Sequence, residues 1–238
     1  MYQKRLYRDY YKQAPYRLNV VYGHSDLYIS ADSELDAAKT REYLKQYYTQ
    51  IEEYILLHPE FRTSLSPLPH DPSAPPIVRE MLGAAQVAGV GPFASVAGAI
   101  ACYVGRELLQ ESREVIVENG GDLFAKILSD KRVGIYLGDH YDLDTLVLTV
   151  PARTHAFGIA SSSASIGHSI NFGSADLVTV VAQDALHADS FATALSNRIK
   201  QESDVEGVLS FARENEWITG MLVFLKGKLF FWGDVELA

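Results

Sequence analysis

The stretch that best predicts the fold of this chain is LVTVVAQDALHADSFATAL, residues 177–195. Its first six residues carry no charge and are rich in β-branched side chains, which is typical of a buried strand. From Ala185 onward the pattern changes to helical spacing, with Ala188, Ala192 and Leu195 on one apolar stripe. A strand followed at once by a helix with one apolar face predicts a sheet that is covered by helices.

The same stretch contains a candidate metal site. Asp189 and Thr193 are four residues apart, so on a helix they lie one above the other, beside the apolar stripe. Oxygen atoms held in this way suit a hard cation. The structural alternative is that Asp189 interacts with the N-terminal end of the helix dipole, while Thr193 bonds back to a helix carbonyl. The stretch alone leaves both interpretations open.

The rest of the chain predicts an α+β protein. Apolar and alternating runs predict strands at 18–22, 27–30, 114–117, 133–137, 146–150, 156–160 and 177–182, and a final hairpin of 221–225 and 229–232. Periodic apolar residues predict helices at 44–55, from 185 and at 205–215. Ser33 followed by Asp36 resembles a capping box before the first helix. Because strands come in hairpins with helices between them, we expect a largely antiparallel sheet with packed helices and an order consistent with internal duplication.

Two segments bear on domain organisation. Residues 64–76 contain five prolines and predict an extended connection, either a boundary near 64–76 between two duplicated halves or a long loop. We expect residues 1–238 to form a single domain. Residues 81–105 carry no charge, but they are rich in Ala and Gly and are interrupted at 89–92. That composition predicts two buried helices and no membrane span.

The composition excludes several classes of protein. The formal net charge is −9, which argues against a nucleic-acid partner, because phosphate backbones attract positive surfaces. Cys102 is the single cysteine, so a disulfide framework and a cysteine metal cluster are both excluded. The N-terminal residues are charged and show no secretory or lipid-attachment signal, so we expect a cytoplasmic protein without a membrane partner. The sequence leaves open whether the protein forms a homo-oligomer.

Three polar segments remain as candidates for chemistry. The common phosphate-loop, dinucleotide, zinc-protease and nucleophile-elbow motifs do not occur in the sequence. Instead, residues 118–122, residues 158–169 and the helix with Asp189 each lie at the end of an apolar strand. Polar loops at one edge of a sheet are a common place for ligands, so these segments predict a binding site.

The first of these segments follows the strand that ends at Val117, and it consists of Glu118, Asn119, Gly120, Gly121 and Asp122. Two glycines permit positive φ angles and close approach of another group to the backbone. Exposed amides in such a turn can cradle a diphosphate, and the aspartate could hold a cation or a hydroxyl. The alternative is a tight hairpin turn of the Asn-Gly kind.

The second segment contains the small hydroxyl residues Ser161, Ser162 and Ser163, which leave room for a ligand and offer it donors. Gly167 and a serine flank His168, which suits an accessible imidazole that acts as acid or base. The alternative is a flexible loop with a surface histidine. A hydrolase triad of Ser163, His168 and Asp189 is conceivable, but the sequence around Ser163 does not build a nucleophile elbow.

The order of four segments resembles the ApbE superfamily of flavin transferases. These segments are the glycine turn, the three serines, Gly167-His168-Ser169 and the Asp189 helix. The chain is most similar to an uncharacterised soluble branch of that superfamily. With that branch it also shares the turn Ser25-Asp26-Leu27 and the segment 88–99. The resemblance to the branch runs from about Val20 to the C-terminus, whereas the resemblance to the transferases covers the segments after Glu114.

The resemblance implies a T-fold-like fold and an activity. Characterised members take FAD and, with Mg²⁺, transfer FMN to a threonine hydroxyl of an acceptor protein. Carried over residue by residue, Asp189 and Thr193 match the magnesium helix, Gly120-Gly121-Asp122 matches the loop beside the flavin diphosphate, and His168 matches the histidine that assists phosphoryl transfer. Chemically this is coherent, because a cation neutralises the diphosphate and a base accepts the threonine proton.

The chain also departs from the transferases. Where they carry a lysine-glycine and an aspartate before the glycine turn, this chain has the uncharged residues 96–101. Three hypotheses therefore stand. The protein is a Mg²⁺-dependent flavin or nucleotide-diphosphate transferase, a non-catalytic protein that binds a flavin, nucleotide or pterin-like ring, or a structural subunit whose tyrosine-rich helix at 43–54 binds a partner.

Overall fold

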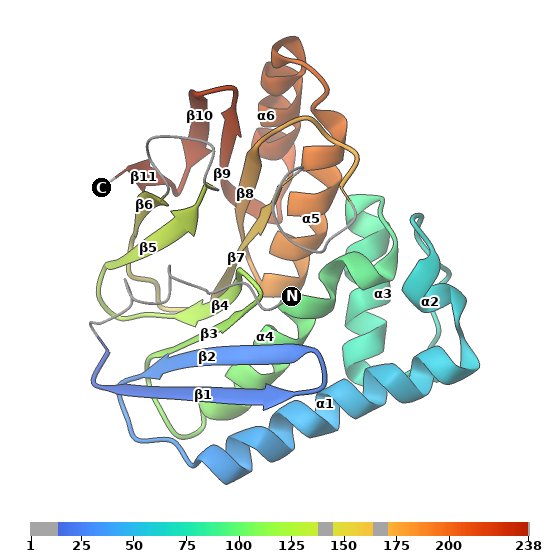
Figure 1. Cartoon of the computed structure of the whole chain (residues 1–238), viewed down its shortest axis with the longest axis vertical. Coiled ribbons are helices and arrows are strands. Elements are labelled where there is room, and N and C mark those ends of the chain that lie inside the picture. Colours follow the sequence, from blue (N-terminus) through green and yellow to red (C-terminus); the bar gives the residue numbers. More distant parts are fainter. Residues whose placement is uncertain (1–13, 138–144, 164–170, 238) are drawn as a thin grey trace.

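The computed structural model describes residues 14–137, 145–163 and 171–237. Its main sheet has eight strands in the order β1-β2-β3-β4-β7-β8-β9-β10, and a small sheet has the order β11-β6-β5. All the pairings are antiparallel. Figure 1 shows the main sheet running from β1 at the lower edge to β10, with the small sheet on the left and the helices on the right. The predicted α+β fold with a largely antiparallel sheet is confirmed.

The bounds of the elements follow the chain. The strands of the main sheet are β1 Tyr16–Tyr22, β2 Ser25–Ala31, β3 Val115–Asn119, β4 Asp122–Lys126, β7 Phe157–Ser162, β8 Leu177–Ala182, β9 Ile218–Leu225 and β10 Lys228–Gly233. Those of the small sheet are β5 Lys131–Tyr136, β6 Thr145–Val150 and β11 Glu236–Leu237. The helices are α1 Ala37–Leu57, α2 Glu60–Thr63, α3 Pro76–Ala88, α4 Val96–Leu108, α5 Ala185–Arg198 and α6 Val205–Glu214, with 3₁₀ turns at Pro92–Ser95 and Glu202–Asp204.

The molecule has three layers, because both faces of the main sheet are apolar. On one face, alternate strand residues such as Val117 and Phe124 pack against α1, α3 and α4, and Val180 packs against α5. On the other face, residues such as Ile159 pack against Val133 and other side chains of the small sheet. The apolar stripe predicted for α5 lies fully in the core. A charge on the helical face of the sheet is therefore buried and needs a specific partner.

The strand β4 was not among the predicted strands. For residues 118–122 the sequence predicts either a ligand-binding glycine turn or a tight hairpin turn, and it predicts no strand directly after them. In the structure Asn119 pairs with Asp122, and β4 returns directly beside β3. Gly120 and Gly121 have φ angles of 70° and 109°, which is the left-handed geometry that a two-residue hairpin turn requires.

Helix α1 begins at Ala37 with Asp36 as its N-cap, whereas the predicted capping box placed the cap at Ser33. The Asp36 carboxylate itself accepts hydrogen bonds from the amides of Ala38 and Lys39, at 2.8 and 3.1 Å. The helix ends at His58, before Pro59, as the sequence predicts. Asp36, which the capping box placed inside the helix, is thus the N-cap itself, three residues after Ser33.

Residues 64–76 form a loop that is held against the helices on both sides of it. Tyr54 of α1 donates to Asp71 at 3.0 Å, and Gln86 of α3 donates to the carbonyl of Leu68 at 3.1 Å. One apolar core cluster contains residues that precede and follow this loop, Phe61 and Ile77 among them. We propose that the whole chain folds as one domain.

The uncharged segment forms α3, a 3₁₀ turn and α4, which is the predicted pair of buried helices with a break between them. In the described part of the chain, no single helix has the length and apolarity to cross a membrane. α3 and the stretch Pro92–Leu108 pass that test only as a pair, and they meet at an angle of 106°.

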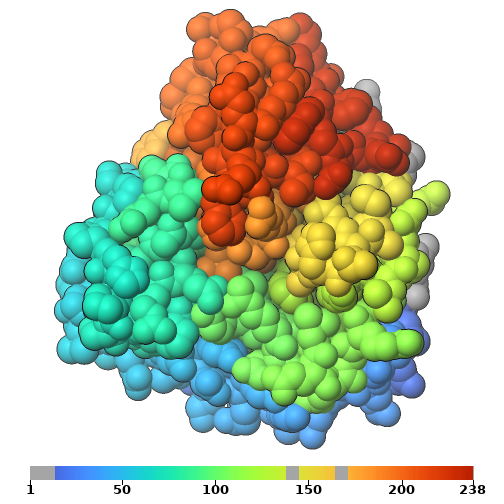
Figure 2. All heavy atoms as spheres, turned by 180° about the vertical axis from the view of Figure 1, so that it is seen from behind, coloured from blue at the N-terminus to red at the C-terminus, as the bar shows by residue number. Residues whose placement is uncertain are grey.

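Figure 2 shows the opposite side of the molecule, where the start of α5 (orange) lies between green and red segments.

Candidate functional site

The turn between β3 and β4 is a two-residue hairpin turn. A Cβ atom built on Gly120 or Gly121 would meet no atom of the described residues within 4 Å, so among these residues the backbone is open to a ligand. The Glu118 carboxylate accepts a hydrogen bond from the Gly121 amide at 2.8 Å. Glu118 thus fixes the turn from the strand before it, and one of the two glycine amides already has a partner.

Asp189 lies in the second turn of α5 and reaches a different part of the chain. Its Oδ2 atom accepts a hydrogen bond from the Gly98 amide at 2.9 Å, and the Ala97 amide also donates to it. These two residues belong to the first turn of α4. A helix N-terminus therefore binds the Asp189 carboxylate with backbone donors.

This contact depends on the absence of a side chain at Gly98. A Cβ there would lie 2.2 Å from the carbonyl oxygen of Ala185 and 2.9 Å from Cβ of Asp189. Only glycine lets α4 approach α5 closely enough for its amide to reach the carboxylate. The uncharged segment thus supplies backbone groups to the site in place of charged side chains.

Asp122 is the second carboxylate of the site. It is the first residue of β4, and it shares the sheet face of Phe124, which is the face covered by α4 and α5. The amide of Ser161 in β7 lies near it and lowers the pKa of its carboxyl group. The neighbouring Asn119 donates to the carbonyl of Ala97 at 3.2 Å, which joins the glycine turn to the start of α4.

The two carboxylates raise each other's cost of ionisation. Burial raises the pKa of Asp189 to about 7, although the amides of Gly98 and Ala97 lower it. Burial, and then the negative charges of Asp189 and Glu118, raise the pKa of Asp122 well above its usual range. Asp122 is buried and Asp189 is partly buried, and two interacting acids with raised pKa values in one place are a candidate functional site.

Thr193 is partly buried and lies one turn beyond Asp189 on α5. In the residues that the structure describes, its hydroxyl has no hydrogen-bond partner, so the back-bond to a helix carbonyl is not formed there. The Asp189 carboxylate is likewise not paired with the start of its own helix, because Asp184 caps α5 and accepts from the His187 amide at 2.9 Å. Neither part of the structural alternative is observed.

The three serines have different positions, because successive strand residues face opposite ways. The Ser161 hydroxyl shares a hydrogen bond of 2.9 Å with Thr179. The Ser162 hydroxyl accepts from Asn171 at 3.0 Å, and the Ser163 hydroxyl donates to the carbonyl of Asp176 at 2.6 Å. Ser163 is thus bonded within its own loop, while Asp189 is bonded to α4, which disfavours the hydrolase triad. Gly167 and His168 lie outside the described residues.

The oxygen atoms present fit a magnesium ion that is shared with a ligand. Across residues 14–137, 145–163 and 171–237, no group of three His, Cys, Asp or Glu side chains is placed to hold a metal ion. Asp122, Asp189 and Thr193 offer two carboxylates and a hydroxyl. Mg²⁺ is commonly bound by one or two carboxylates together with substrate phosphates and water, so this donor set fits the ion when a phosphate ligand is present.

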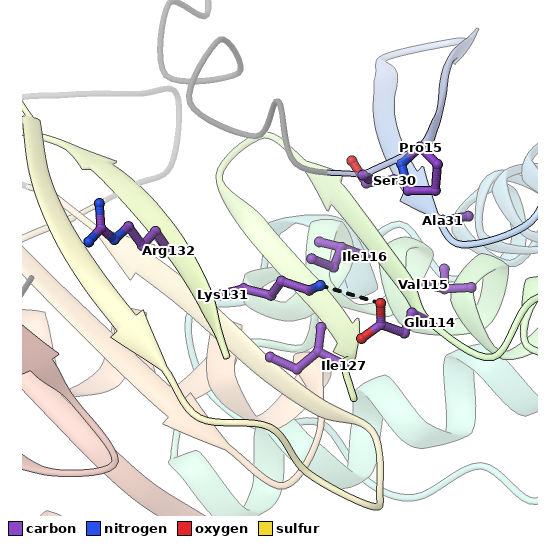
Figure 3. Close-up of a pocket in the computed structure, with 10 residues that line it drawn as sticks. Pro15, Ser30, Ala31, Glu114, Val115, Ile116, Ile127, Lys131 and Arg132 are labelled. Atoms are coloured by element: carbon purple, nitrogen blue, oxygen red, sulfur yellow. Dashed lines mark hydrogen bonds and ion pairs between the residues drawn. The ribbon is translucent and has the colours of Figure 1, made fainter. Parts of the chain in front are cut away.

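A separate pocket of about 90 Å³ lies between the edge of β5 and the start of β3 (Figure 3). Lys131 forms an ion pair with Glu114 across it at 3.3 Å, and Glu114 also accepts from the Ser129 amide at 3.2 Å. None of the described site residues lines this pocket. Glu114 and Lys131 bond to each other, which fits a role in joining the two sheets.

Comparison with known proteins identifies the family. The model of the family described as AbpE bacteria matches residues 8–228. The chain belongs to this family. A UPF0280 protein of Methanocaldococcus jannaschii is 33% identical over 219 residues, which cover 90% of this chain and 89% of the relative. A UPF0280 protein of Methanothrix thermoacetophila is 38% identical over 192 residues, covering 79% of each.

Solved structures confirm the fold. The flavin transferase ApbE from Vibrio cholerae matches with a TM-score of 0.55 and 14% identity, covering 92% of this chain and 96% of that one. The apo flavinyl transferase ApbE from Pseudomonas stutzeri matches with a TM-score of 0.57 and 13% identity, covering 92% and 93%. The AbpE family member therefore has the ApbE fold, and the resemblance read from its motifs is confirmed at the level of family and fold.

The sequence did not point to every residue that builds the site. Ala97 and Gly98 were noted only because their segment lacks charge, yet their amides hold Asp189. Asn171 was not considered at all. A glycine inside an apolar helix, at a position where alanine would be the better helix former, is the signal that could have drawn attention to Gly98.

Proposed function

We propose that this AbpE family member is a Mg²⁺-dependent transferase that acts on a flavin, or on another nucleotide diphosphate, in the manner of the ApbE superfamily. The observation that carries the proposal is the meeting of Asp122 and Asp189 beside the open turn at Gly120 and Gly121. Buried carboxylates that repel each other favour a bound cation, and a glycine turn favours a phosphate group. The solved structures with the same fold, which are flavin transferases by name, support this choice of chemistry.

Each residue has a role in this proposal. Asp189 and Thr193 hold the cation from α5, and Asp122 faces them from the sheet. Gly120 and Gly121 bind the diphosphate, while Glu118 and Asn119 fix the turn to β3 and α4. The ion, when bound, neutralises charge on the diphosphate. With the amides of α4 already bound to Asp189, the carboxylate is oriented before any ligand arrives.

The remaining assignments come from the family resemblance. His168 would accept the proton of the attacking threonine, and Ser161, Ser162, Ser163 and Gly167 would line the ligand. The acceptor would be a threonine of another protein. A cytoplasmic location remains a prediction.

A second candidate is a protein that binds the same ligand without transferring it. The observation that favours it is the uncharged start of α4: residues 96–101 contribute amides to Asp189 and a carbonyl to Asn119, but no cation and no additional acid. Phosphoryl transfer is catalysed largely by charge and position, so a site with fewer charges binds more readily than it reacts. Such a protein would hold a flavin, a nucleotide or a pterin-like ring.

Binding is tested by titrating FAD into the protein and following flavin fluorescence, with and without Mg²⁺. We expect quenching that depends on Mg²⁺ and is lost in Asp189→Asn. Glu206→Gln is the matched control, since it also removes one negative charge but from an exposed ion pair on α6. If FAD does not bind, or if both variants behave alike, the proposed site is wrong.

Turnover separates the two candidates. FAD is incubated with the protein, Mg²⁺ and a threonine-containing acceptor peptide, and the products are examined by mass spectrometry. FMN on threonine, or AMP release that stops in His168→Ala, supports the transferase. Tight binding of intact FAD without either product supports the binding protein.

A further inference from the structure

One amide side chain connects the strand and the helix that carry the two halves of the candidate site. The Nδ2 atom of Asn171 donates to Oγ of Ser162 at 3.0 Å and to Oγ of Ser196 at 2.7 Å. Ser162 is the last residue of β7, and Ser196 lies near the end of α5. Both serines are buried, with exposures of 3% and 0%, so these bonds are not shared with solvent.

The contacts fix the orientation of the amide. Oδ1 of Asn171 accepts a hydrogen bond from the Gly173 amide at 2.7 Å. A flipped side chain would place its NH₂ group against that N–H group, so only one orientation satisfies all three contacts. Asn171 is therefore held by three hydrogen bonds, two of which reach other elements of the fold.

The residues after Asn171 are held on α5 independently of it. The Phe172 amide donates to Oδ1 of Asn197 at 2.7 Å, and the Ser174 amide donates to the carbonyl of Ile199 at 2.7 Å. A Cβ on Gly173 would lie 2.0 Å from the carbonyl of Ser196, so the backbone rests directly on the helix. The distinctive contribution of Asn171 is thus its bond to β7.

The two serines that Asn171 contacts, Ser162 and Ser196, each lie on an element that also carries or neighbours one of the two carboxylates. Ser162 follows Ser161, whose amide is near enough to Asp122 to lower the pKa of that carboxyl group. Ser196 lies two turns beyond Asp189, on the same helix. When Asp122 and Asp189 are both ionised, their charges repel each other across the contact between α5 and the sheet, and the Asn171 hydrogen bonds resist a separation of the helix from β7.

We propose that Asn171 is a positioning residue that holds α5 against β7 and so keeps Asp189 and Thr193 opposite Asp122. The inference rests on the proposed function for the role of these three residues in binding a cation. Beyond that function, we infer that Asn171 keeps the three residues in place before a cation or a phosphate ligand binds. A preformed site binds more tightly, because the ligand does not have to bring the two elements together.

The first test compares two asparagines of the same connection. Asn171→Ala removes the link to β7, and Asn197→Ala removes only the neighbouring bond to Phe172. Mg²⁺ is titrated at a fixed concentration of FAD, and flavin fluorescence reports half-saturation. We expect Asn171→Ala to raise the Mg²⁺ concentration at half-saturation roughly tenfold, and Asn197→Ala to change it by less than about twofold. Equal effects of the two variants would overturn the positioning role.

The second test needs no metal. At pH 8 in EDTA, the urea midpoint is measured for the wild type, Asn171→Ala, Asp189→Asn and the double variant. Without the link to β7 the carboxylates can separate, so removing the charge of Asp189 should raise the midpoint less in the Asn171→Ala background than in the wild type. An equal rise in both backgrounds contradicts the inference.

The two tests separate the inference from the function on which it rests. If the wild type shows no response to Mg²⁺, the proposed function fails, while the urea cycle still decides whether Asn171 holds the carboxylates together. If the wild type responds to Mg²⁺ and the cycle is additive, the function stands and the positioning role is rejected.

Discussion

Two carboxylates of one helix, Asp184 and Asp189, have opposite environments. Asp184 caps α5 and accepts a hydrogen bond from the backbone amide of His187. Its carboxylate also lies 2.8 Å from Nδ1 of the His187 imidazole, and that imidazole stacks on Trp217. Burial raises the pKa of Asp184, but the hydrogen bonds and the charge of His187 together lower it by more. The net result is a pKa below the usual range. Asp189 has amide donors but faces another acid, and its pKa is raised to about 7.

The difference shows how a structural acid can be told from a functional one. Asp184 is satisfied within its own turn, so the fold gains from its charge. Asp189 is oriented by the Gly98 amide, and because burial raises its pKa, its charged form is unfavourable in the fold. Under the proposed function, we expect a bound cation to offset this cost. A site that costs stability in the absence of its ligand is typical of function. The predictions below test this contrast, from the largest expected effect to the smallest.

Gly98→Ala should disrupt the environment of Asp189 most severely. The new Cβ would collide with the backbone of α5, so α4 and α5 must separate, at a cost of about 3 kcal/mol. Gly83→Ala in α3 is the matched control: its Cβ would meet no atom within 4 Å, and alanine should raise the stability of that helix by about 0.5–1 kcal/mol. Urea unfolding of both variants measures the contrast, and a small loss for Gly98→Ala would contradict the close packing of the two helices.

Asp189→Asn should separate stability from function. Removing the charge relieves the repulsion with Asp122, so the metal-free protein at pH 8 should gain about 1 kcal/mol of unfolding free energy, after allowance for solvent screening. The same variant should weaken Mg²⁺-dependent FAD binding by roughly 100-fold, since a ligand oxygen has lost its charge. Urea unfolding and flavin titration test the two parts, and a loss of stability would mean that Asp189 is a structural acid.

Asp184→Ala should have the opposite pattern. The helix loses its cap and the partner of His187, so the unfolding free energy should fall by about 1 kcal/mol. Mg²⁺-dependent FAD binding should stay within about twofold of the wild type, since Asp184 is not one of the proposed cation ligands. Thermal unfolding and flavin titration measure both effects. If metal binding fails with stability intact, the assignment of the two acids is reversed.

Acidification should reveal the smallest effect. Because the folded-state pKa of Asp184 lies below its unfolded value, its contribution is complete at neutral pH and is lost as the pH falls below about 4. Asp184→Asn keeps a capping side chain but cannot ionise, so the stability difference from the wild type should shrink from about 0.5 kcal/mol at pH 6 toward zero at pH 3. Urea midpoints at the two pH values measure it, and a difference that stays constant would mean that the charge of Asp184 is irrelevant.

The sequence was a good guide to some parts of this molecule. The change of period after Ala182 predicted β8 and α5, and the uncharged segment predicted two buried helices, because burial leaves a direct pattern of apolar residues. It missed β4 as a strand, but one of its two interpretations of residues 118–122, the tight Asn-Gly hairpin turn, is confirmed. The sequence left both open because a two-residue hairpin turn and a ligand-binding glycine turn use the same residues. In the tyrosine-rich helix, Tyr47 is buried against the core and donates to Glu107, so this tyrosine is used inside the fold. Binding of a partner by the rest of the helix stays a prediction.

The candidate site was only half visible in the sequence. The positions of Asp189 and Thr193 follow from helical periodicity alone. The amides that hold Asp189 carry no side-chain signature, so the role of Ala97 and Gly98 could not be read from composition. The role of Asn171 was equally hidden, because it depends on two serines that are distant in the chain.

By itself, the sequence determined the order of strands and helices, the apolar face of each, and the polar residues at their ends, because these depend on local periodicity. Only the tertiary structure decided which acids meet. Asp122 and Asp189 lie far apart in the chain, and they come together because β4 pairs with β7 while α5 packs across both β7 and the start of α4. Repulsion between two charges is a property of their distance in space, and no local pattern records it.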